Sequence, residues 1–100
     1  MKNKICRYHP DFASDLRVAT EYYDDISVEL GNRLRDTIRK QLELISEHSE
    51  AFAIIHNQVR AVRLRNFPYL ILFRSYPDHV YFVGFVHAAS DRTHWFDRVD

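Results

Sequence analysis

Apolar residues in the first half of the chain recur with the period of a helix. One stripe has spacings of 4, 3, 4, 3 and 4 residues and consists of Phe12, Leu16, Ala19, Tyr23, Ile26 and Leu30. A second stripe follows at once and consists of Leu34, Ile38, Leu42 and Ile45. These spacings predict two amphipathic helices that pack on the protein's own sheet. Pro10 and Asp11 favour the start of the first helix. Gly31 favours its end, so we expect a short antiparallel join at residues 30–32.

The second half of the chain changes to the period of a strand. In QVRAVRLRNF, residues 58–67, Val62 and Leu64 face one side of a strand. Arg63 and Arg65 face the other side. Pro68 lacks the amide hydrogen of a central ladder, so the chain turns or begins a new strand there.

Two strands that are apolar on both faces follow this corner. They are predicted for YLILFRSY, residues 69–76, and VYFVGFVH, residues 80–87. The YPDH sequence between them is typical of a turn, with Pro77 at its second position. Strands of this composition are expected in the centre of a sheet that is covered on both sides.

With KICRYHP, residues 4–10, as the first strand, the element order is β-α-α-β-β-β. Consecutive strands joined by short turns pair antiparallel, and a helix hairpin covers one face of the sheet. We therefore predict an α+β fold in which an antiparallel sheet packs against a helix hairpin. Residues 1–100 are expected to form one domain, because a chain of this length can bury roughly 60–70% of its unfolded surface.

Composition narrows the class of protein. No apolar run approaches the ~20 residues that a membrane span requires, and the N-terminal residues contain no apolar core of a signal peptide. Cys6 is the only cysteine, which fits a reducing compartment. The histidines do not show the i, i+4 spacing of a metal site on a helix. We expect a cytoplasmic protein without metal, cofactor or membrane association.

The net charge of zero conceals an uneven distribution. Residues 51–77 contain no acidic residue but include Arg60, Arg63, Arg65 and Arg74. A local positive field is therefore expected despite the neutral total. Three interpretations of these arginines remain open: an exposed sheet face, ion pairs with the acid-rich helices, or a surface that binds an acidic partner.

Two segments of the second half resemble a known family. VRAVRLRNFPYLILFR followed by VYFVGFVHAASDRTHW is similar to the RelE/ParE toxins of bacterial type II toxin–antitoxin modules. EYYDDISVELGNRLRDTI also resembles the helix hairpin of that family. The resemblance implies a RelE/ParE-like fold, a cognate antitoxin as partner, and DNA gyrase or the ribosome with its mRNA as target. The chain has Ser90 where the family usually has arginine, and Arg92 where it usually has proline.

The resemblance also implies candidate site residues. Cleavage of RNA would need an acid–base group and positive charge beside the phosphate. His87 is the acid–base candidate, since the reference pKa of histidine lies near neutrality. Arg63 and Arg65 are the candidate phosphate ligands. Further candidates for binding the target or a phosphate are Arg60, Tyr69 and Arg92.

Other roles for some of these side chains are open. His87 could instead hydrogen-bond a loop carbonyl at the end of its strand. Tyr69 could stack on a base or pack in the core. Trp95 could anchor the C-terminal segment or support a nucleobase.

Three functions follow from the resemblance. The first is a toxin that inhibits growth by acting on DNA gyrase or on translation and is neutralised by an antitoxin. The second is a ribosome-dependent mRNA endoribonuclease with His87 and the arginines in its site. The third is an attenuated homologue that acts only as a binding module. Ser90 and the neutral net charge favour a non-nucleolytic toxin over the nuclease.

Overall fold

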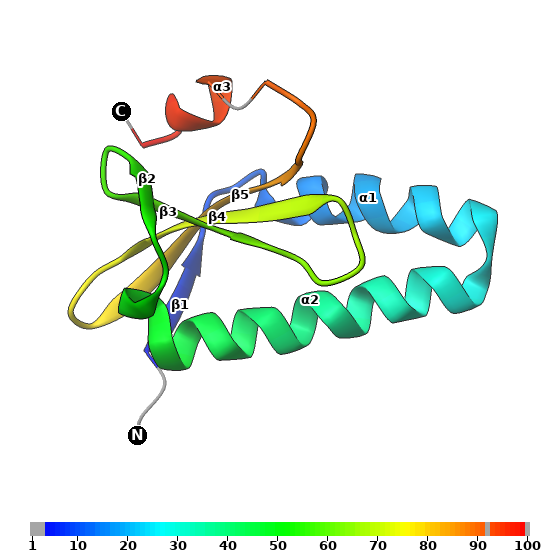
Figure 1. Ribbon diagram of the computed structural model, residues 1–100, viewed down its shortest axis with the longest axis horizontal. Helices are drawn as coiled ribbons and strands as arrows, with labels where there is room; N and C mark the ends of the chain where they lie inside the picture. Colours follow the sequence, from blue (N-terminus) through cyan, green and yellow to red (C-terminus); the bar gives the residue numbers. More distant parts are fainter. Residues whose placement is uncertain (1–3, 92, 100) are drawn as a thin grey trace.

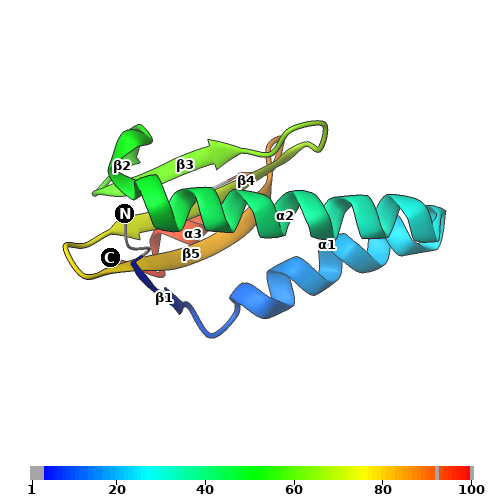
Figure 2. The same cartoon turned by 90° about the horizontal axis from the view of Figure 1, so that it is seen from below.

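A five-stranded sheet carries a helix hairpin on one face and a short C-terminal helix on the other (Figure 1). The computed structural model describes residues 4–91 and 93–99. The strands are β1 (Ile5–Tyr8), β2 (Ile54–His56), β3 (Val59–Arg63), β4 (Tyr69–Ser75) and β5 (His79–His87). The helices are α1 (Phe12–Ile26), α2 (Val28–His48), the single 3-10 turn η1 (Ser49–Ala51) and α3 (Thr93–Phe96). The spatial order of the strands is β1-β5-β4-β3-β2, and α2 crosses the face of this sheet (Figure 2).

The sheet is mixed, which corrects the prediction of an antiparallel sheet. Neighbouring strands from β2 to β5 pair antiparallel, as predicted. Strand β1 pairs parallel with β5, from Ile5 opposite His79 to Tyr8 opposite Phe82. The antiparallel rule applies to strands joined by short turns, whereas β1 is joined to β5 only through all the intervening elements. The edge strand β2 was also not predicted.

The join between the helices lies at Ser27, four residues before the predicted position. Ser27 is extended, with φ −163° and ψ 146°, and its hydroxyl accepts a hydrogen bond from the Leu30 amide at 3.0 Å. This is an N-cap for α2. Gly31 lies inside α2, where it allows a close approach. A Cβ at Gly31 would lie 1.7 Å from Oδ1 of Asp24. The hydrogen bond from Arg35 to this carboxylate lowers the pKa of Asp24.

Replacing the capping serine should weaken the helix hairpin. Ser27→Ala leaves an amide of the first turn of α2 without its side-chain acceptor, so we expect a loss of about 1 kcal/mol in the free energy of unfolding. Ser27→Asp retains an acceptor and should cost far less. Urea denaturation of the two variants measures the difference. Equal losses for both would mean that Ser27 does not act as a cap.

The core forms on both faces of the sheet, as the apolar strands predicted. Phe12, Leu34, Ile71 and Phe82 belong to the cluster on the side of α1 and α2. The cluster on the side of α3 contains Val59, Leu72, Val83 and Val86, with Trp95 and Phe96 packed against it. A β-bulge interrupts the pairing of β4 with β5 between Leu72 and Phe73. It places both Val83 and Gly84 on the side of α3.

The β2–β3 turn contains two residues in the left-handed region. Asn57 has φ 44° and Gln58 has φ 62°. Such a hairpin turn favours glycine at its second position. We expect Gln58→Gly to raise the free energy of unfolding by about 0.5 kcal/mol, since relief of the backbone strain exceeds the added chain entropy. Asn57→Gly should gain less, because asparagine tolerates this conformation. Thermal unfolding of both variants tests the order.

Candidate functional site

His87 and Tyr69 lie side by side where β5 ends and β4 begins. Their backbones pair across the two strands, and their rings meet edge to face with centroids 5.3 Å apart. Tyr69 also stacks on Phe85 at 4.8 Å. Nδ1 of His87 accepts a hydrogen bond from the Ala89 amide at 3.0 Å, so the neutral ring carries its proton on Nε2. The loop group bound by His87 is thus an amide and not a carbonyl.

A pocket of about 330 Å³ opens beside this pair, between α1, the end of β5 and the C-terminal segment. We call it the His87 pocket. Its walls include Ser14, Val18, Tyr69, His87, Ser90 and Trp95. Burial raises the pKa of Tyr69, and the nearby Tyr23 adds to this effect. The lining of the pocket is mostly aromatic and apolar, and its polar groups are hydroxyls, the imidazole of His87 and the carboxylate of Asp15.

Two of the predicted arginines, Arg60 and Arg63, do not lie beside His87. Val62 and Leu64 pack in the cluster on the helix side, so Arg63 points to the other face of the sheet. Arg65 is exposed in the loop between β3 and β4. Arg92 lies outside the described residues. The structure therefore brings Tyr69 and His87 together and places Arg63 across the sheet from them.

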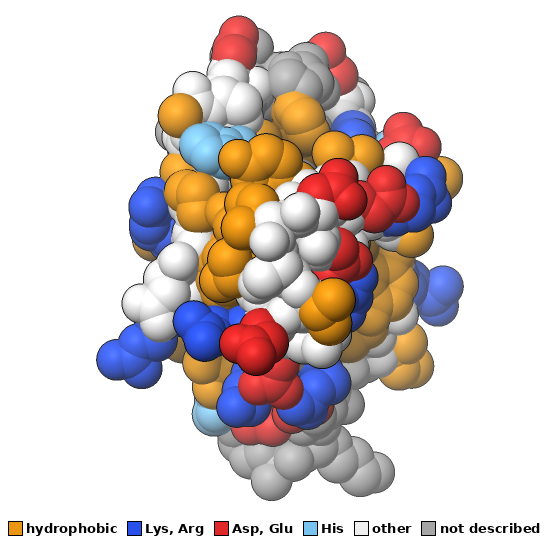
Figure 3. Space-filling model, turned by 90° about the vertical axis from the view of Figure 1, so that its right-hand side faces the viewer, with side chains coloured by type: hydrophobic (Ala, Val, Ile, Leu, Met, Phe, Trp, Pro, Cys, Tyr) orange, Lys and Arg blue, Asp and Glu red, His pale blue; other side chains and the backbone are white. Residues whose placement is uncertain are grey.

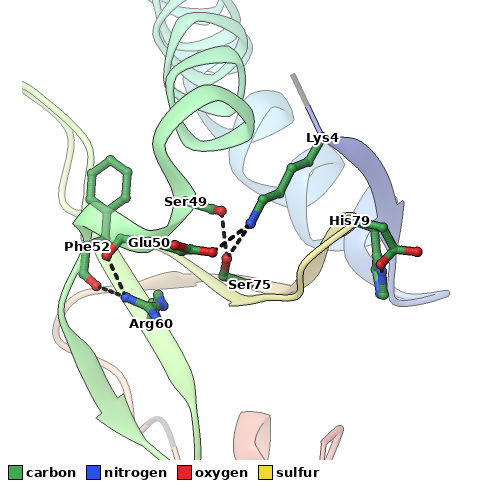
Figure 4. A network of polar contacts seen from close by, with 8 residues as sticks. Lys4, Ser49, Glu50, Phe52, Arg60, Ser75 and His79 are labelled. Carbon is green, nitrogen blue, oxygen red and sulfur yellow. Dashed lines mark hydrogen bonds and ion pairs between the residues drawn. The ribbon is translucent and has the colours of Figure 1, made fainter. Parts of the chain in front are cut away.

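Arg60 lies near the other end of the sheet, in a polar network (Figure 4). Its guanidinium donates hydrogen bonds to the carbonyls of Phe52 at 2.6 Å and Glu50 at 3.0 Å. In the same network the Ser75 hydroxyl lies 3.0 Å from Nζ of Lys4 and 2.7 Å from the Ser49 hydroxyl. Lys4 also pairs with Glu50. These contacts connect Lys4, just before β1, with β4 and η1, and they connect β3 with the segment around η1, which provides a structural role for Arg60.

The wall that α1 contributes to the His87 pocket was not predicted. Ser14 and Val18 lie one turn apart on α1, outside the apolar stripe that faces the core. The one available signal was Val18, an apolar residue that interrupts the polar face of the helix. Only tertiary structure places this face beside the end of β5.

The C-terminal segment is held at the edge of β5 by an ion pair. Strand β1 ends opposite Phe82, so within residues 4–91 and 93–99 no strand pairs with the edge of β5 beyond that residue. Asp15 accepts a hydrogen bond from the Phe85 amide at 3.3 Å, and Arg98 donates one to the Val83 carbonyl at 2.9 Å. The two side chains meet at 2.8 Å. They thereby satisfy polar groups that an open strand edge would expose.

Trp95 lies under the guanidinium of Arg98, whose Cζ is 5.1 Å from the ring centroid. The indole packs against the α3 side of the sheet, over Gly84. Trp95 thus anchors the C-terminal segment, which was the first of its two predicted roles.

A second and larger hollow lies between α1, α2 and β1. Its volume is about 470 Å³, and we call it the interhelical groove. Its apolar lining includes Leu16, Ile38 and Leu42, while Arg35 and Arg39 contribute charged groups. Burial raises the pKa of Tyr8 at the β1 side of the groove. The groove can accept apolar side chains of a partner, while Arg35 is paired with Asp24 and Arg39 with Asp36 and Glu43.

Among residues 4–91 and 93–99, no group of three or more histidine, cysteine or carboxylate side chains has the arrangement of a metal site. No helix in the described part of the chain combines the length and apolar character required to cross a bilayer.

The fold is similar to that of a chain from the chromosomal ParDE TA system from P. aeruginosa. The TM-score is 0.71, the sequence identity is 16%, and the match covers 84% of this chain and 95% of that chain. No family model and no curated protein matches the sequence. The two helices on a five-stranded mixed sheet, together with this likeness, confirm the predicted fold: the chain has a RelE/ParE-like fold.

Proposed function

We propose that this chain is the toxin of a type II toxin–antitoxin module and acts in the cytoplasm. The observation that carries the proposal is its fold, which is similar to that of a chain from a ParDE system. The sequence adds independent support, because the Phe-Pro-Tyr corner and the block from His87 to Trp95 occur in the order typical of RelE/ParE toxins. A cognate antitoxin is the expected partner.

The interhelical groove is the proposed antitoxin site. It is the larger of the two hollows described above, and its lining is mainly apolar. Carboxylates on the antitoxin would compete for Arg35 and Arg39 with the acidic residues that these arginines already contact. They could also pair with the exposed Arg63 on β3 and Arg65 in the loop that follows. The apolar face of an amphipathic helix fits such a groove. The adjoining edge strand β1 is available for an added strand.

A protein target is favoured over cleavage of mRNA. A nuclease site would need cations beside the acid–base residue to stabilise the phosphorane. Arg63 points away from His87, and the cation next to the pocket, Arg98, is already paired with Asp15 in the pocket wall. These positions support a toxin that binds its target, such as DNA gyrase, without cutting RNA. The ribosome-dependent endoribonuclease with His87, Arg63 and Arg65 is the alternative that the experiment below separates.

Growth arrest and two biochemical assays test the proposal. Inducible expression of the wild type is expected to arrest bacterial growth, and coexpression of its cognate antitoxin should restore growth. The purified protein should then inhibit supercoiling by DNA gyrase. The same preparation should leave mRNA intact on ribosomes.

Variants separate the alternatives. His87→Ala is compared with His48→Ala, which changes an exposed histidine on α2. mRNA cleavage by the wild type that is lost only in His87→Ala would replace the binding mechanism with the nuclease. A folded wild type that neither arrests growth nor acts in either assay would overturn the toxin proposal in favour of an attenuated binding module.

A further inference from the structure

The outward face of α1 is unusually apolar for a surface helix. Val18, Tyr22 and Ile26 follow one another at intervals of four residues, so their side chains share one face. Their exposed fractions are 67%, 60% and 56%. A run of this kind on a helix that already packs its other face on the sheet marks a candidate interaction surface. We call these three residues the outer stripe of α1.

The outer stripe leads into the His87 pocket. Val18 belongs to both, since it lines the pocket and is the first residue of the stripe. A chain of ring contacts continues this surface from Tyr22 through Tyr23 and Tyr69 to His87, with centroid distances of 5.2, 6.3 and 5.3 Å. A volume of about 330 Å³ is sufficient for a large side chain of a partner. Aromatic-walled pockets of this kind are typical sites of binding hot spots.

The charge around this surface is acidic. Residues 11–26 contain five acidic residues and one basic residue, for a balance of −4. Arg98 pairs with Asp15 and Arg35 pairs with Asp24, which leaves a balance of −2 on the helix. Glu21 and Asp25 each lie three residues after a member of the outer stripe and therefore flank it. Figure 3 shows hydrophobic side chains in a band on the hairpin end of the molecule, with acidic side chains beside it.

An apolar stripe, an adjoining aromatic pocket and flanking acidic residues together indicate the kind of partner. We propose that the outer stripe of α1 and the His87 pocket form a docking site for a basic amphipathic helix of a target protein, separate from the interhelical groove. The apolar face of the partner helix would cover Val18 and Tyr22, one of its side chains would enter the pocket, and its cations would face Glu21 and Asp25. A nucleic acid backbone, or the same α1 face of a second copy of this chain, would bring negative charge to an already acidic surface. The inference rests on the proposed toxin function, because it assigns the target face of the toxin.

A binding experiment tests the surface independently of toxicity. The probe is a synthetic helical peptide of leucine, tryptophan and lysine with one apolar face, and its control carries glutamate in place of lysine. Calorimetry with the full chain should show the lysine peptide binding at least about tenfold more tightly than the glutamate peptide. Val18→Ser combined with Tyr22→Ser should weaken that binding by at least about tenfold. Leu44→Ser, which changes an exposed leucine on α2, is the matched control and should bind as the wild type does.

A charge variant and added salt test the electrostatic part of the proposal. Asp25→Lys should weaken binding of the lysine peptide and leave the folded protein intact, because Asp25 is exposed. Added salt should weaken binding by the wild type in the same direction. Equal affinity for the two peptides, or unchanged binding by the double serine variant, would overturn the docking site.

Growth assays then separate this inference from the proposed function. If the wild type arrests growth, the double serine variant should not, while Leu44→Ser should. Arrest by both the wild type and the double variant would overturn the docking site and leave the toxin proposal standing. If the wild type does not arrest growth, the toxin proposal fails, and the peptide measurements alone decide whether the surface binds a basic helix.

Discussion

Asp15→Ala is expected to lower the free energy of unfolding by about 3 kcal/mol, the low end of the range for breaking a buried ion pair. The side chains of Asp15 and Arg98 are only 13% and 16% exposed. Removing the carboxylate leaves the guanidinium of Arg98 nearly buried without its counter-ion. It also removes the acceptor of the Phe85 amide at the edge of β5. Both losses add to the cost, because each leaves a polar group away from water.

Urea denaturation measures this loss, with an exposed ion pair as the control. Arg17 and Glu21 lie 3.8 Å apart on α1, and their side chains are 63% and 64% exposed. Glu21→Ala should therefore cost about 0.5 kcal/mol or less. A double-mutant cycle with Asp15→Ala and Arg98→Met gives the coupling within the ion pair. A loss below about 1 kcal/mol for Asp15→Ala would show that the pair does not hold the C-terminal segment in place.

The strands of the second half could be predicted from sequence because their signals are local. Alternation placed Val62 and Leu64 on one face of the strand, and in the structure both pack on the side of the helices. Pro68 ended one strand, and the YPDH turn closed a hairpin whose Tyr76 amide binds the carbonyl of His79. The strands that are apolar on both faces predicted a sheet that is covered on both sides. On the face opposite the helix hairpin, α3 provides part of this cover.

The features that were not predicted depend either on two local signals that compete for one helix boundary or on contacts between residues far apart in the sequence. Gly31 carried a helix-end signal, yet Ser27 ends α1 because its hydroxyl caps α2. The parallel pairing of β1 with β5 and the ion pair of Asp15 with Arg98, 83 residues apart, involve residues far apart in the chain. Single-sequence periodicity contains no information about such partners.

The candidate site also combines residues that local sequence signals predicted with residues that only the tertiary structure brings together. Tyr69 and His87 lie at the predicted ends of adjacent strands, and hairpin geometry brings such residues together. Arg63 lies on the strand next to Tyr69, as predicted, but its side chain is on the opposite face of the sheet from Tyr69 and His87. The alternation of side chains implies this position once Tyr69 is known to face the helices. The contribution of α1 to the pocket depends on how the helix hairpin crosses the sheet, and the sequence does not determine that crossing.

The ion pair and the His87 pocket are linked through the C-terminal segment. Asp15 and Trp95 both line the pocket, and Arg98 contacts both of them. A change that displaces Trp95 should therefore alter the pocket as well as the stability of the chain. Trp95 is the only tryptophan in the sequence, so its fluorescence reports this displacement directly.

Gly84→Ala is expected to displace Trp95 and to lower the free energy of unfolding by about 2–3 kcal/mol. A Cβ at residue 84 would lie 2.0 Å from Cδ1 and 2.2 Å from Nε1 of the indole, so the two groups cannot occupy their positions together. Gly84 lies in the middle of β5, where the backbone is fixed by the sheet, and the indole must therefore move. The expected signals are a red shift of tryptophan emission and a lower urea midpoint.

The other glycine of the chain provides the matched control for this prediction. A Cβ at Gly31 would displace the end of the Asp24 side chain and loosen its ion pair with Arg35, which is partly exposed and therefore contributes about 1 kcal/mol or less. Gly31→Ala also gains about 1 kcal/mol in helix propensity, so we expect little net change in stability and unchanged emission. A red shift in Gly84→Ala alone would place the cost at the contact with Trp95. Unchanged emission in Gly84→Ala, with wild-type stability, would mean that the sheet and α3 adjust to the added methyl group and that Gly84 is not required for the packing of Trp95.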